Sequence, residues 1–302
     1  MTVLVIGATG RHGGTGQYLV RRLLDEGKPV RVLVRTLDER SDRLAALGAE
    51  VAVGDLADRR TLIPALGDVD LAYFTYPIAA GVIPAAANYA SAVREVGGSL
   101  RTVVMSMGPA HPQHPSELGR AQWLAEQVLE WAGLDVLILR VSAPFHENLV
   151  LLHSRSVQNE GVLRNSFGTG PVPWISGEDA AELALAALLH PDRFDGSVVY
   201  PGGSEIFTHD QIAELLGELL NRPVRYEPVS KEHWQRELVD LAGTSPGEVV
   251  NVAMAQHISS VGEVIARGQR TITADPDALR QWTGRAPTTL RHFLQANLAS
   301  FQ

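Results

Sequence analysis

The sequence predicts an α/β fold, a doubly wound parallel sheet joined to a smaller C-terminal α/β lobe. Three observations indicate it. Short β-branched runs alternate with longer segments of helical periodicity, a glycine-rich stretch links the first run to the first helical segment, and the alternation ends after Val141. Such alternation is typical of parallel strands whose connecting helices cover both faces of a sheet. We therefore expect an α/β domain over residues 1–150 and a smaller lobe, partly interwoven with it, over residues 151–302.

The first half of the chain is expected to contain six strands and five helices in alternation. The expected strands are Val3–Ile6, Val30–Val34, Glu50–Val53, Asp70–Thr75, Arg101–Ser106 and Val136–Val141. The expected helices are Thr15–Glu26, Ser41–Leu47, Arg59–Leu66, Ile83–Val96 and Glu117–Trp131. Each helix has apolar residues at three- and four-residue spacings on one side, which is the pattern of a helix packed against a sheet.

The C-terminal part is punctuated by Gly and Pro and has a less regular pattern. A helix is expected to begin near Glu178, a strand to span Ser197–Tyr200, and another helix to begin near His209. Thr208 and Gln211 form a capping-box pattern at the start of this last helix, because each side chain can bond the other residue's backbone N–H.

Composition excludes several classes of protein. The 302 residues are 45% hydrophobic and 20% charged, within the range of globular proteins, and no apolar run approaches the length of a membrane span. The absence of cysteine rules out disulfides, thiolate metal sites and a cysteine nucleophile. A net charge of −8 argues against a nucleic-acid partner. With no basic leader after Met1, we expect a cytoplasmic protein with neither a membrane nor a nucleic-acid partner.

The glycine-rich stretch from Gly7 to Gly16 reads Gly-Ala-Thr-Gly-Arg-His-Gly-Gly-Thr-Gly. Glycines are needed where backbone turns tightly and approaches a pyrophosphate, and the N-terminus of the following helix offers free N–H groups to phosphates. Because a strand precedes the stretch and a helix follows it, the pattern predicts a dinucleotide site in a Rossmann-like domain. The residues expected to contact the cofactor here are Gly7, Thr9, Gly10, Arg11, His12, Gly13 and Gly14. Arg11 either pairs with the phosphates or points into solvent.

Cofactor choice is expected to depend on the residue after the second strand, which is Arg35. An Arg at this point pairs with a 2′-phosphate, so NADP(H) is favoured; it can also stack on adenine, so NAD(H) stays possible. Asp55 and Leu56 follow the third strand and are expected along the adenine ring, although Asp55 also suits the cap of a helix near Ala57. Thr75, which ends the fourth strand, completes the expected cofactor-binding residues.

The chain resembles the short-chain dehydrogenases/reductases, and within them the atypical NmrA-like branch. The glycine stretch also fits the spacing T-G-x-x-x-G-x-G of that superfamily. The other stretches that carry the resemblance are V-R-V-L-V-R at 30–35, the elements of 125–148 that end in E-N-L, V-P-W-I-S-G-E-D at 172–179, Y-P-G-G-S-E-I-F-T at 200–208 and W-T-G-R-A-P at 282–287. The resemblance implies a Rossmann-like domain, a smaller lobe, a cleft between them, and NADP(H) or NAD(H) as cofactor. Members of the branch include quinone and dye reductases and non-catalytic redox sensors.

The acid pair of the superfamily, Y-x-x-x-K, is missing. No tyrosine of the chain is followed four residues later by lysine, and the two lysines, Lys28 and Lys231, stand far from the fifth strand. The lysine that isoflavone-reductase relatives carry on the following helix corresponds to Gln122. A tyrosine acid activated by lysine is therefore excluded.

Weaker candidates surround the expected cleft. Ser106, at the end of the fifth strand, and His111, in the Pro-rich loop after it, are the candidate catalytic residues; each also suits an ordinary structural or surface role. His111 and His114 lack a further ligand, so no metal site is expected.

The resemblance adds Tyr76, Phe145, His146 and Asn148 to the lining of the substrate cleft. Phe145 fits a core position equally well, and Glu147 is expected at the surface.

Three functions remain open. The first is an NADPH-dependent reductase of a quinone, dye or similar flat electron-poor compound, which accepts hydride without a strong acid. The second is a non-catalytic NADP(H) sensor or regulator with a protein partner. The third is a tailoring enzyme that assists oxygenation in the biosynthesis of aromatic natural products.

Overall fold

The computed structural model describes residues 1–10, 12–97, 100–244, 250–268 and 273–302. The strands of its main sheet are β1 (Val3–Ile6), β2 (Val30–Val34), β3 (Glu50–Val53), β4 (Leu71–Phe74), β5 (Arg101–Met107), β6 (Asp135–Val141) and β9 (Val198–Val199). All seven are parallel, in the order β3-β2-β1-β4-β5-β6-β9. The predicted fold class is therefore confirmed.

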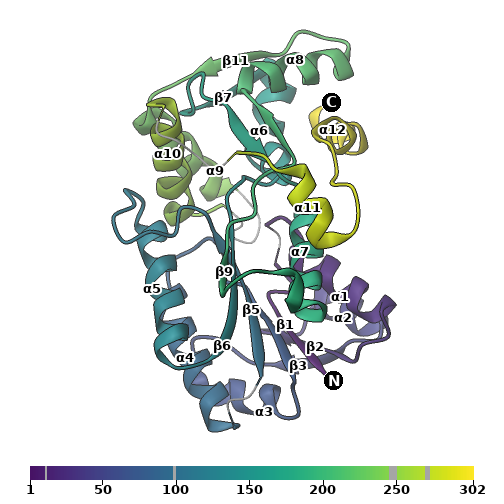
Figure 1. Ribbon diagram of the computed structural model, residues 1–302. Coiled ribbons are helices and arrows are strands. Elements are labelled where there is room, and N and C mark those ends of the chain that lie inside the picture. The colour runs from purple at the N-terminus through teal and green to yellow at the C-terminus, as the bar shows by residue number, and fades with distance from the viewer. Residues whose placement is uncertain (11, 98–99, 245–249, 269–272) are drawn as a thin grey trace.

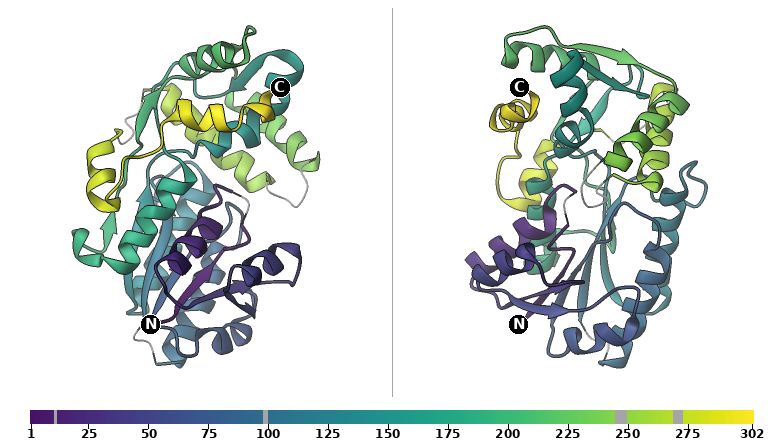
Figure 2. Two further views of the ribbon diagram at one scale, coloured as in Figure 1. Left: turned by 90° about the vertical axis from the view of Figure 1, so that its right-hand side faces the viewer. Right: turned by 180° about the vertical axis from the view of Figure 1, so that it is seen from behind.

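Helices cover both faces of this sheet (Figures 1 and 2). One face packs against α1 (Thr15–Asp25), α2 (Glu39–Ala46) and α7 (Gly177–Leu189). The other packs against α3 (Leu62–Leu66), α4 (Val82–Glu95) and α5 (Glu117–Trp131). A 3₁₀ turn, η1 (Arg59–Thr61), precedes α3.

The predicted element boundaries hold to within two residues, and two of the differences are informative. α2 begins at Glu39 and not at Ser41, because the Asp38 side chain accepts the N–H groups of Arg40 and Ser41 and caps the helix earlier. The strand predicted at Ser197–Tyr200 is confirmed as β9, but β9 is one residue shorter at each end. The capping box of Thr208 and Gln211 is confirmed, with both reciprocal bonds present.

The C-terminal lobe lies over the carboxyl ends of the sheet strands, at the top of Figure 1. It contains two small sheets, one antiparallel pair of β8 (Val172–Trp174) with β10 (Glu205–Phe207) and one parallel pair of β7 (Val162–Asn165) with β11 (Arg225–Pro228). Its helices are α6 (Glu147–Glu160), α8 (His209–Leu220), α9 (Lys231–Thr244), α10 (Val252–Ala266) and α12 (Leu290–Ala296), with the 3₁₀ turn η4 (Leu298–Phe301). The 3₁₀ turn η2 (Pro191–Arg193) and α11 (Pro276–Thr283) pack against α7 instead.

The strand order reverses between β1 and β4, and this reversal positions the site. From β1 the chain winds outward through β2 and β3, then crosses to β4 on the other side of β1. In open α/β sheets such a switch point opens a crevice beyond the carboxyl ends of the two strands. The loops after β1, β4, β5 and β6 meet there, under the C-terminal lobe (Figure 1).

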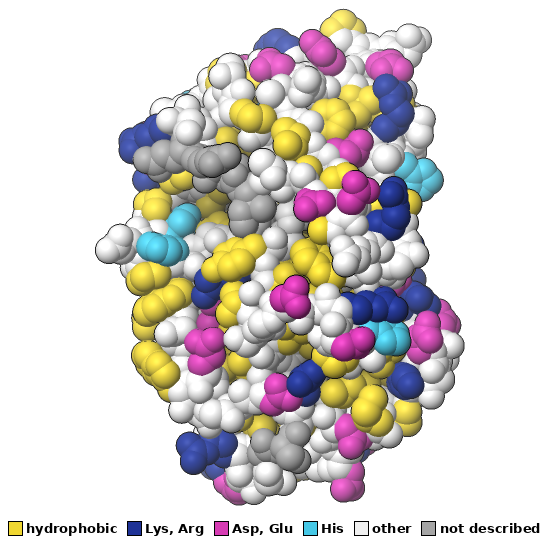
Figure 3. All heavy atoms as spheres, viewed as in Figure 1, with side chains coloured by type: hydrophobic (Ala, Val, Ile, Leu, Met, Phe, Trp, Pro, Cys, Tyr) yellow, Lys and Arg dark blue, Asp and Glu magenta, His cyan; other side chains and the backbone are white. Residues whose placement is uncertain are grey.

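Charge is spread over the surface. On the face seen in Figure 3, side chains of both signs are interspersed, with no large patch of one sign. Among the described residues, no helix combines the length and apolar character needed to cross a membrane.

Four histidines are buried in the C-terminal lobe among the described residues, and three of them are almost completely enclosed. His146, His153 and His209 are at most 4% exposed. The ring of His153 stacks on Trp234 at a centroid distance of 5.2 Å, and that of His209 stacks on Tyr226 at 5.5 Å. Burial disfavours the charged imidazolium and lowers the pKa of each of the three histidines to about 3.

We predict that acid destabilises the protein through these rings. Below pH 6.5 the unfolded chain protonates its histidines while the folded protein does not, so stability falls by up to about 1.4 kcal/mol per pH unit for each ring. His209→Phe should therefore reduce the loss of unfolding free energy between pH 7.5 and pH 5 by about 2 kcal/mol. Urea denaturation at both pH values measures the difference. Replacement of the exposed His292 by Phe is the matched control, and an equal change in both variants would contradict the prediction.

Candidate dinucleotide site

The loop after β1 turns on glycines. Gly7, Gly13 and Gly14 have φ values of +86°, +68° and +62°, which side chains of L-residues rarely adopt. The Gly10 N–H donates to the Gly7 carbonyl at 2.9 Å, and a Cβ on Gly10 would lie 2.9 Å from the same oxygen. A Cβ on Gly16 would lie 2.6 Å from it. Only glycine fits these close approaches.

The loop leads into α1, whose N-terminus has no side-chain cap among the described residues. Gly14 is the residue before the helix, no described side chain caps the first turn, and a Cβ on Gly14 would meet no described atom within 4 Å. Free N–H groups and the positive end of the helix dipole therefore face open space. This is the geometry in which a helix holds a pyrophosphate.

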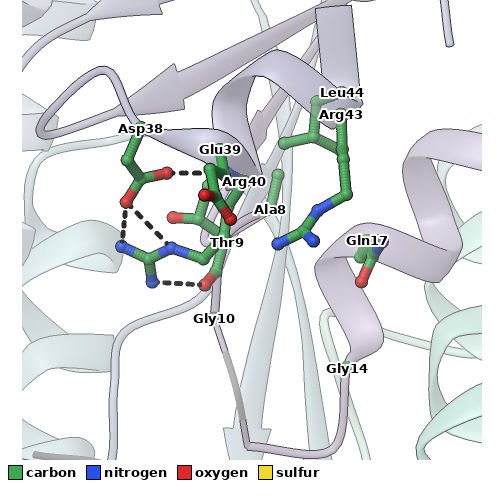
Figure 4. Close-up of a pocket in the computed structure, with 10 residues that line it drawn as sticks. All are labelled: Ala8, Thr9, Gly10, Gly14, Gln17, Asp38, Glu39, Arg40, Arg43 and Leu44. Carbon is green, nitrogen blue, oxygen red and sulfur yellow. Dashed lines mark hydrogen bonds and ion pairs between the residues drawn. The ribbon is translucent and has the colours of Figure 1, made fainter. Parts of the chain in front are cut away.

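A hollow of about 660 Å³ opens beside this helix end (Figure 4). Its lining consists of Ala8, Thr9, Gly10, Gly14, Gln17, Asp38, Glu39, Arg40, Arg43 and Leu44. The Arg40 guanidinium links the start of α2 to the glycine loop. It donates to the Asp38 carboxylate at 2.5 and 3.0 Å and to the Thr9 carbonyl at 3.2 Å. These bonds hold the pKa of Asp38 down at about 2. The Arg43 guanidinium points into the hollow unhindered (Figure 4).

Arg35, which the sequence singles out, lies exposed just after β2 and outside this lining. Sequence reasoning missed Asp38, Arg40 and Arg43. The signal was present in the Asp38-x-x-Ser41 capping pattern, which starts α2 at Glu39 and so turns its first residues toward the glycine loop. Arg11 lies outside the described residues.

The other expected cofactor residues lie around the ends of β3 and β4. A Cβ on Gly7 would lie 2.3 Å from the Thr75 methyl group, so Thr75 packs directly under the glycine loop. Asp55 Oδ1 accepts the Ala57 N–H at 2.9 Å, while Asp58 and not Asp55 caps the helical turn that follows. The Leu56 side chain packs on the sheet core, and its carbonyl accepts from Asn88 at 2.8 Å.

Phe145 closes the other end of the glycine loop. A Cβ on Gly13 would lie 2.4 Å from the Phe145 ring, and the His12 ring centroid is 5.7 Å from that of Phe145. The His12 Nδ1 is buried with no hydrogen-bond partner among the described residues. Burial lowers the pKa of His12 to about 4, so this ring is neutral.

The residues at the start of α6 differ in how deeply they are buried. His146 is fully buried against Phe293, so the structure does not bring it to an open cleft, and both ring nitrogens lack partners among the described residues. Asn148 is partly buried, and its Oδ1 likewise has no described partner. Glu147, expected at the surface, instead accepts the Gly177 N–H at 3.0 and 3.1 Å. Burial raises the pKa of Glu147 to about 7, aided by the nearby Glu178 and Asp179.

Ser106 is bound within the protein. Its hydroxyl donates to Glu126, a fully buried carboxylate on α5 that also accepts from Arg140 at 2.9 Å. Burial raises the pKa of Glu126, and the Arg140 guanidinium opposes this rise. The Ser106 proton is therefore committed to Glu126, and only the oxygen lone pairs of Ser106 can serve a ligand. His111 is exposed, with its Nδ1 accepting the Gln113 N–H at 3.1 Å.

Two tyrosines lie near the crevice, and neither is a better acid than free phenol. Tyr73 is fully buried, its hydroxyl donates to Thr15 at 3.1 Å, and burial raises its pKa to about 12. Tyr76 is half-buried, and burial followed by the charge of Asp55 raises its pKa. Among the residues that the structure describes, no cluster of three His, Asp or Glu side chains suits a metal ion.

The observed geometry fits a dinucleotide. The uncapped end of α1 with its bare Gly14 would hold the pyrophosphate, and the hollow beside it would take the adenosine end. The His12 Nδ1, which has no hydrogen-bond partner among the described residues, lies at the Phe145 end of the loop. The structure thus supplies a cradle for the pyrophosphate, with polar protein groups on either side of that cradle.

Comparison with known proteins agrees with this geometry. A family model described as the NmrA-like family matches residues 1–294. An NAD(P)H azoreductase from Xenophilus azovorans is 29% identical over 99% of this chain and 99% of its own length. A solved NADPH-dependent quinone oxidoreductase from Escherichia coli, complexed with NADPH, has a TM-score of 0.79 at 21% identity and covers 98% of this chain and 99% of its own. A triphenylmethane reductase from Citrobacter, complexed with NADP(H), has a TM-score of 0.78 at 22% identity, covering 97% and 99%.

We predict that Gly14→Ala weakens dinucleotide binding at least about tenfold, because the added methyl group enters the space over the first-turn N–H groups and the φ of +62° strains alanine. Gly27→Ala is the matched control. Gly27 has a φ of +67°, also meets no described atom within 4 Å, and lies beyond the opposite end of α1. Both variants should lose about 1 kcal/mol of stability, but only Gly14→Ala should lose affinity in calorimetric titration. Equal affinities would show that the loop is only a structural turn.

Proposed function

The chain belongs to the NmrA-like family, and we propose that it is an NADPH-dependent reductase of a flat, electron-poor aromatic acceptor such as a quinone or dye. The observation that carries the proposal is a dinucleotide cradle at the switch point of the sheet with no activated tyrosine beside it. The azoreductase relative and the two solved reductases are named for chemistry of this kind and support a small aromatic substrate.

The cofactor is NADP(H), which supplies a hydride when bound. The first-turn N–H groups of α1 bind its pyrophosphate, and the hollow lined by Asp38, Arg40 and Arg43 receives the adenosine ribose. Because Arg40 compensates the charge of Asp38, Arg43 and the exposed Arg35 are the cations among the described residues that are left for a 2′-phosphate. Asp38 also provides a carboxylate for a free 2′-hydroxyl, so NAD(H) stays a possible second cofactor.

The acceptor needs little acid catalysis. Hydride addition to a quinone gives a stable phenolate, which water protonates. What the protein must supply is position, since an acceptor misplaced by about 1 Å can lose ~10² in rate. Phe145, packed on Gly13 at the end of the loop, offers an aromatic surface on which a flat acceptor can lie. Tyr76, Asn148 and the lone pairs of Ser106 are the polar groups that we place around it.

We predict that Arg43→Ala and Arg35→Ala each lower the preference for NADPH over NADH by about 10- to 100-fold, since a charge-assisted bond contributes roughly 1.5–3 kcal/mol. Arg40→Ala is the contrasting variant. It removes the brace between Thr9 and Asp38 and should weaken both cofactors alike. Titration of each variant with both cofactors gives the ratios, and ratios equal to that of the parent would place the 2′-phosphate elsewhere.

We also predict that the parent oxidises NADPH with 1,4-naphthoquinone and that Tyr76→Phe retains this turnover within a few-fold, because burial makes this phenol a poor acid at neutral pH. Single-turnover NADPH oxidation is the measurement. A thousandfold loss in Tyr76→Phe would establish a tyrosine acid. A parent that binds NADPH but turns over no acceptor would instead favour the sensor function.

A further inference from the structure

A serine and two histidines meet where α10 packs against the loop that precedes α5. His257 Nδ1 lies 2.6 Å from the Ser116 Oγ, and the ring centroids of His257 and His114 are 6.2 Å apart. Ser116 is fully buried and His257 is 6% exposed. Neither residue lines the hollow for the adenosine, and neither has a part in the function proposed above.

The hydrogen bonds of Ser116 favour one tautomer of His257. As the N-cap of α5, the Ser116 Oγ accepts the Gly119 N–H at 3.2 Å, and its other partner among the described residues is His257 Nδ1, so donation to Nδ1 is what pairs the buried Ser116 proton. Burial lowers the pKa of His257 to about 3, with smaller contributions from His114 and His12, so the ring is neutral. A neutral imidazole that accepts at Nδ1 carries its proton on Nε2.

Other contacts of α10 place this helix, and with it His257, over the crevice. The Asn251 side chain, at the start of α10, donates to the Ile78 carbonyl at 2.9 Å in the loop after β4. The Gln256 side chain accepts the Glu117 N–H at 3.2 Å, after the loop that follows β5. His257 itself bonds Ser116, in the loop between β5 and α5. His257 therefore lies beside the loops from the carboxyl ends of β4 and β5, where the acceptor is expected to bind.

We propose that His257 is a catalytic hydrogen-bond donor, whose Nε2–H binds the acceptor atom on which negative charge develops, and that Ser116 is the positioning residue that holds this tautomer. The proposal rests on the reductase function. The hydride adds to the acceptor with its two electrons and leaves the cofactor oxidised, the negative charge moves to the conjugated oxygen or nitrogen, and water supplies the proton. His257 neither gains nor loses a proton, which suits a ring that burial keeps neutral. A preorganised donor of this kind stabilises the transition state more than the ground state.

The experiment uses the full chain with NADPH and 1,4-naphthoquinone. His257→Leu removes the donor and should lower kcat by about 10²–10³-fold, whereas His257→Gln keeps an N–H and should retain activity within about tenfold of the parent. The affinity for NADPH should be unchanged in both. Val252→Ala, at an exposed position of the same helix, is the control for substitution in α10 and should leave kcat within about threefold.

Ser116 is tested by a readout that a purely structural role would not change. Nitrogen-15 NMR of the parent should show His257 with its proton on Nε2, and Ser116→Ala should give a mixture of tautomers with a kcat loss of about tenfold. Ser116→Thr keeps the hydroxyl and the helix cap, so it should restore the parent spectrum and rate.

The outcomes separate the two proposals. Turnover by the parent together with a kcat of His257→Leu within threefold overturns the donor role alone. A proton on Nδ1 of His257 in the folded parent overturns the role of Ser116. A parent that turns over neither 1,4-naphthoquinone nor a monoazo dye overturns the reductase function, and the donor role with it.

Discussion

Gly13 and Gly177 make a close backbone contact between distant parts of the chain. A Cβ on Gly177 would lie 1.8 Å from the Gly13 carbonyl oxygen, so the N-terminus of α7 can rest on the glycine loop only because it begins with glycine. Much of the site depends on this contact. It braces the loop against the N-terminus of α7, where the Gly177 N–H donates to Glu147, and α7 then lies on the same sheet face as α1. A methyl group at position 177 would push apart the two segments that shape the cofactor cradle.

Local pattern was sufficient to predict the sheet and the glycine loop, because both depend on neighbours in sequence. The strands from Val3 to Val141 and the helices between them follow hydrophobic period and turn chemistry, and the structure agrees with them closely. The division of the chain near residue 150 stays a prediction. Beyond that point the pattern predicted only where α7, β9 and α8 fall, since the packing of two-residue strands and short helices is decided by tertiary contacts that no local period records.

The site shows the same division. Gly7, Gly10 and Thr75 meet where the motif expects them, whereas Asp38 and Arg43 reach the hollow because the Asp38 side chain caps α2 and so sets where this helix begins. His257 stands 141 residues from the serine that binds it, and nothing in its helical surroundings distinguishes it from a core residue. His146 illustrates the opposite error, since its place beside a family motif says little about burial, and packing against Phe293 encloses it.

The return of α7 and β9 to the first sheet has a consequence for recombination between relatives. The chain leaves the nucleotide-binding layers after β6, builds α6, β7 and β8, comes back through α7 and β9, and leaves again. A substrate-side lobe is therefore not a single cassette that can be exchanged by one crossover. A chimera joined at residue 150 would pair the α7 of one parent with the glycine loop of the other. These two segments touch at Gly13 and Gly177, where there is no room for a side chain at position 177. Exchange of acceptor specificity between such proteins requires two matched segments, cut on either side of α7 and β9, with the core helix left behind.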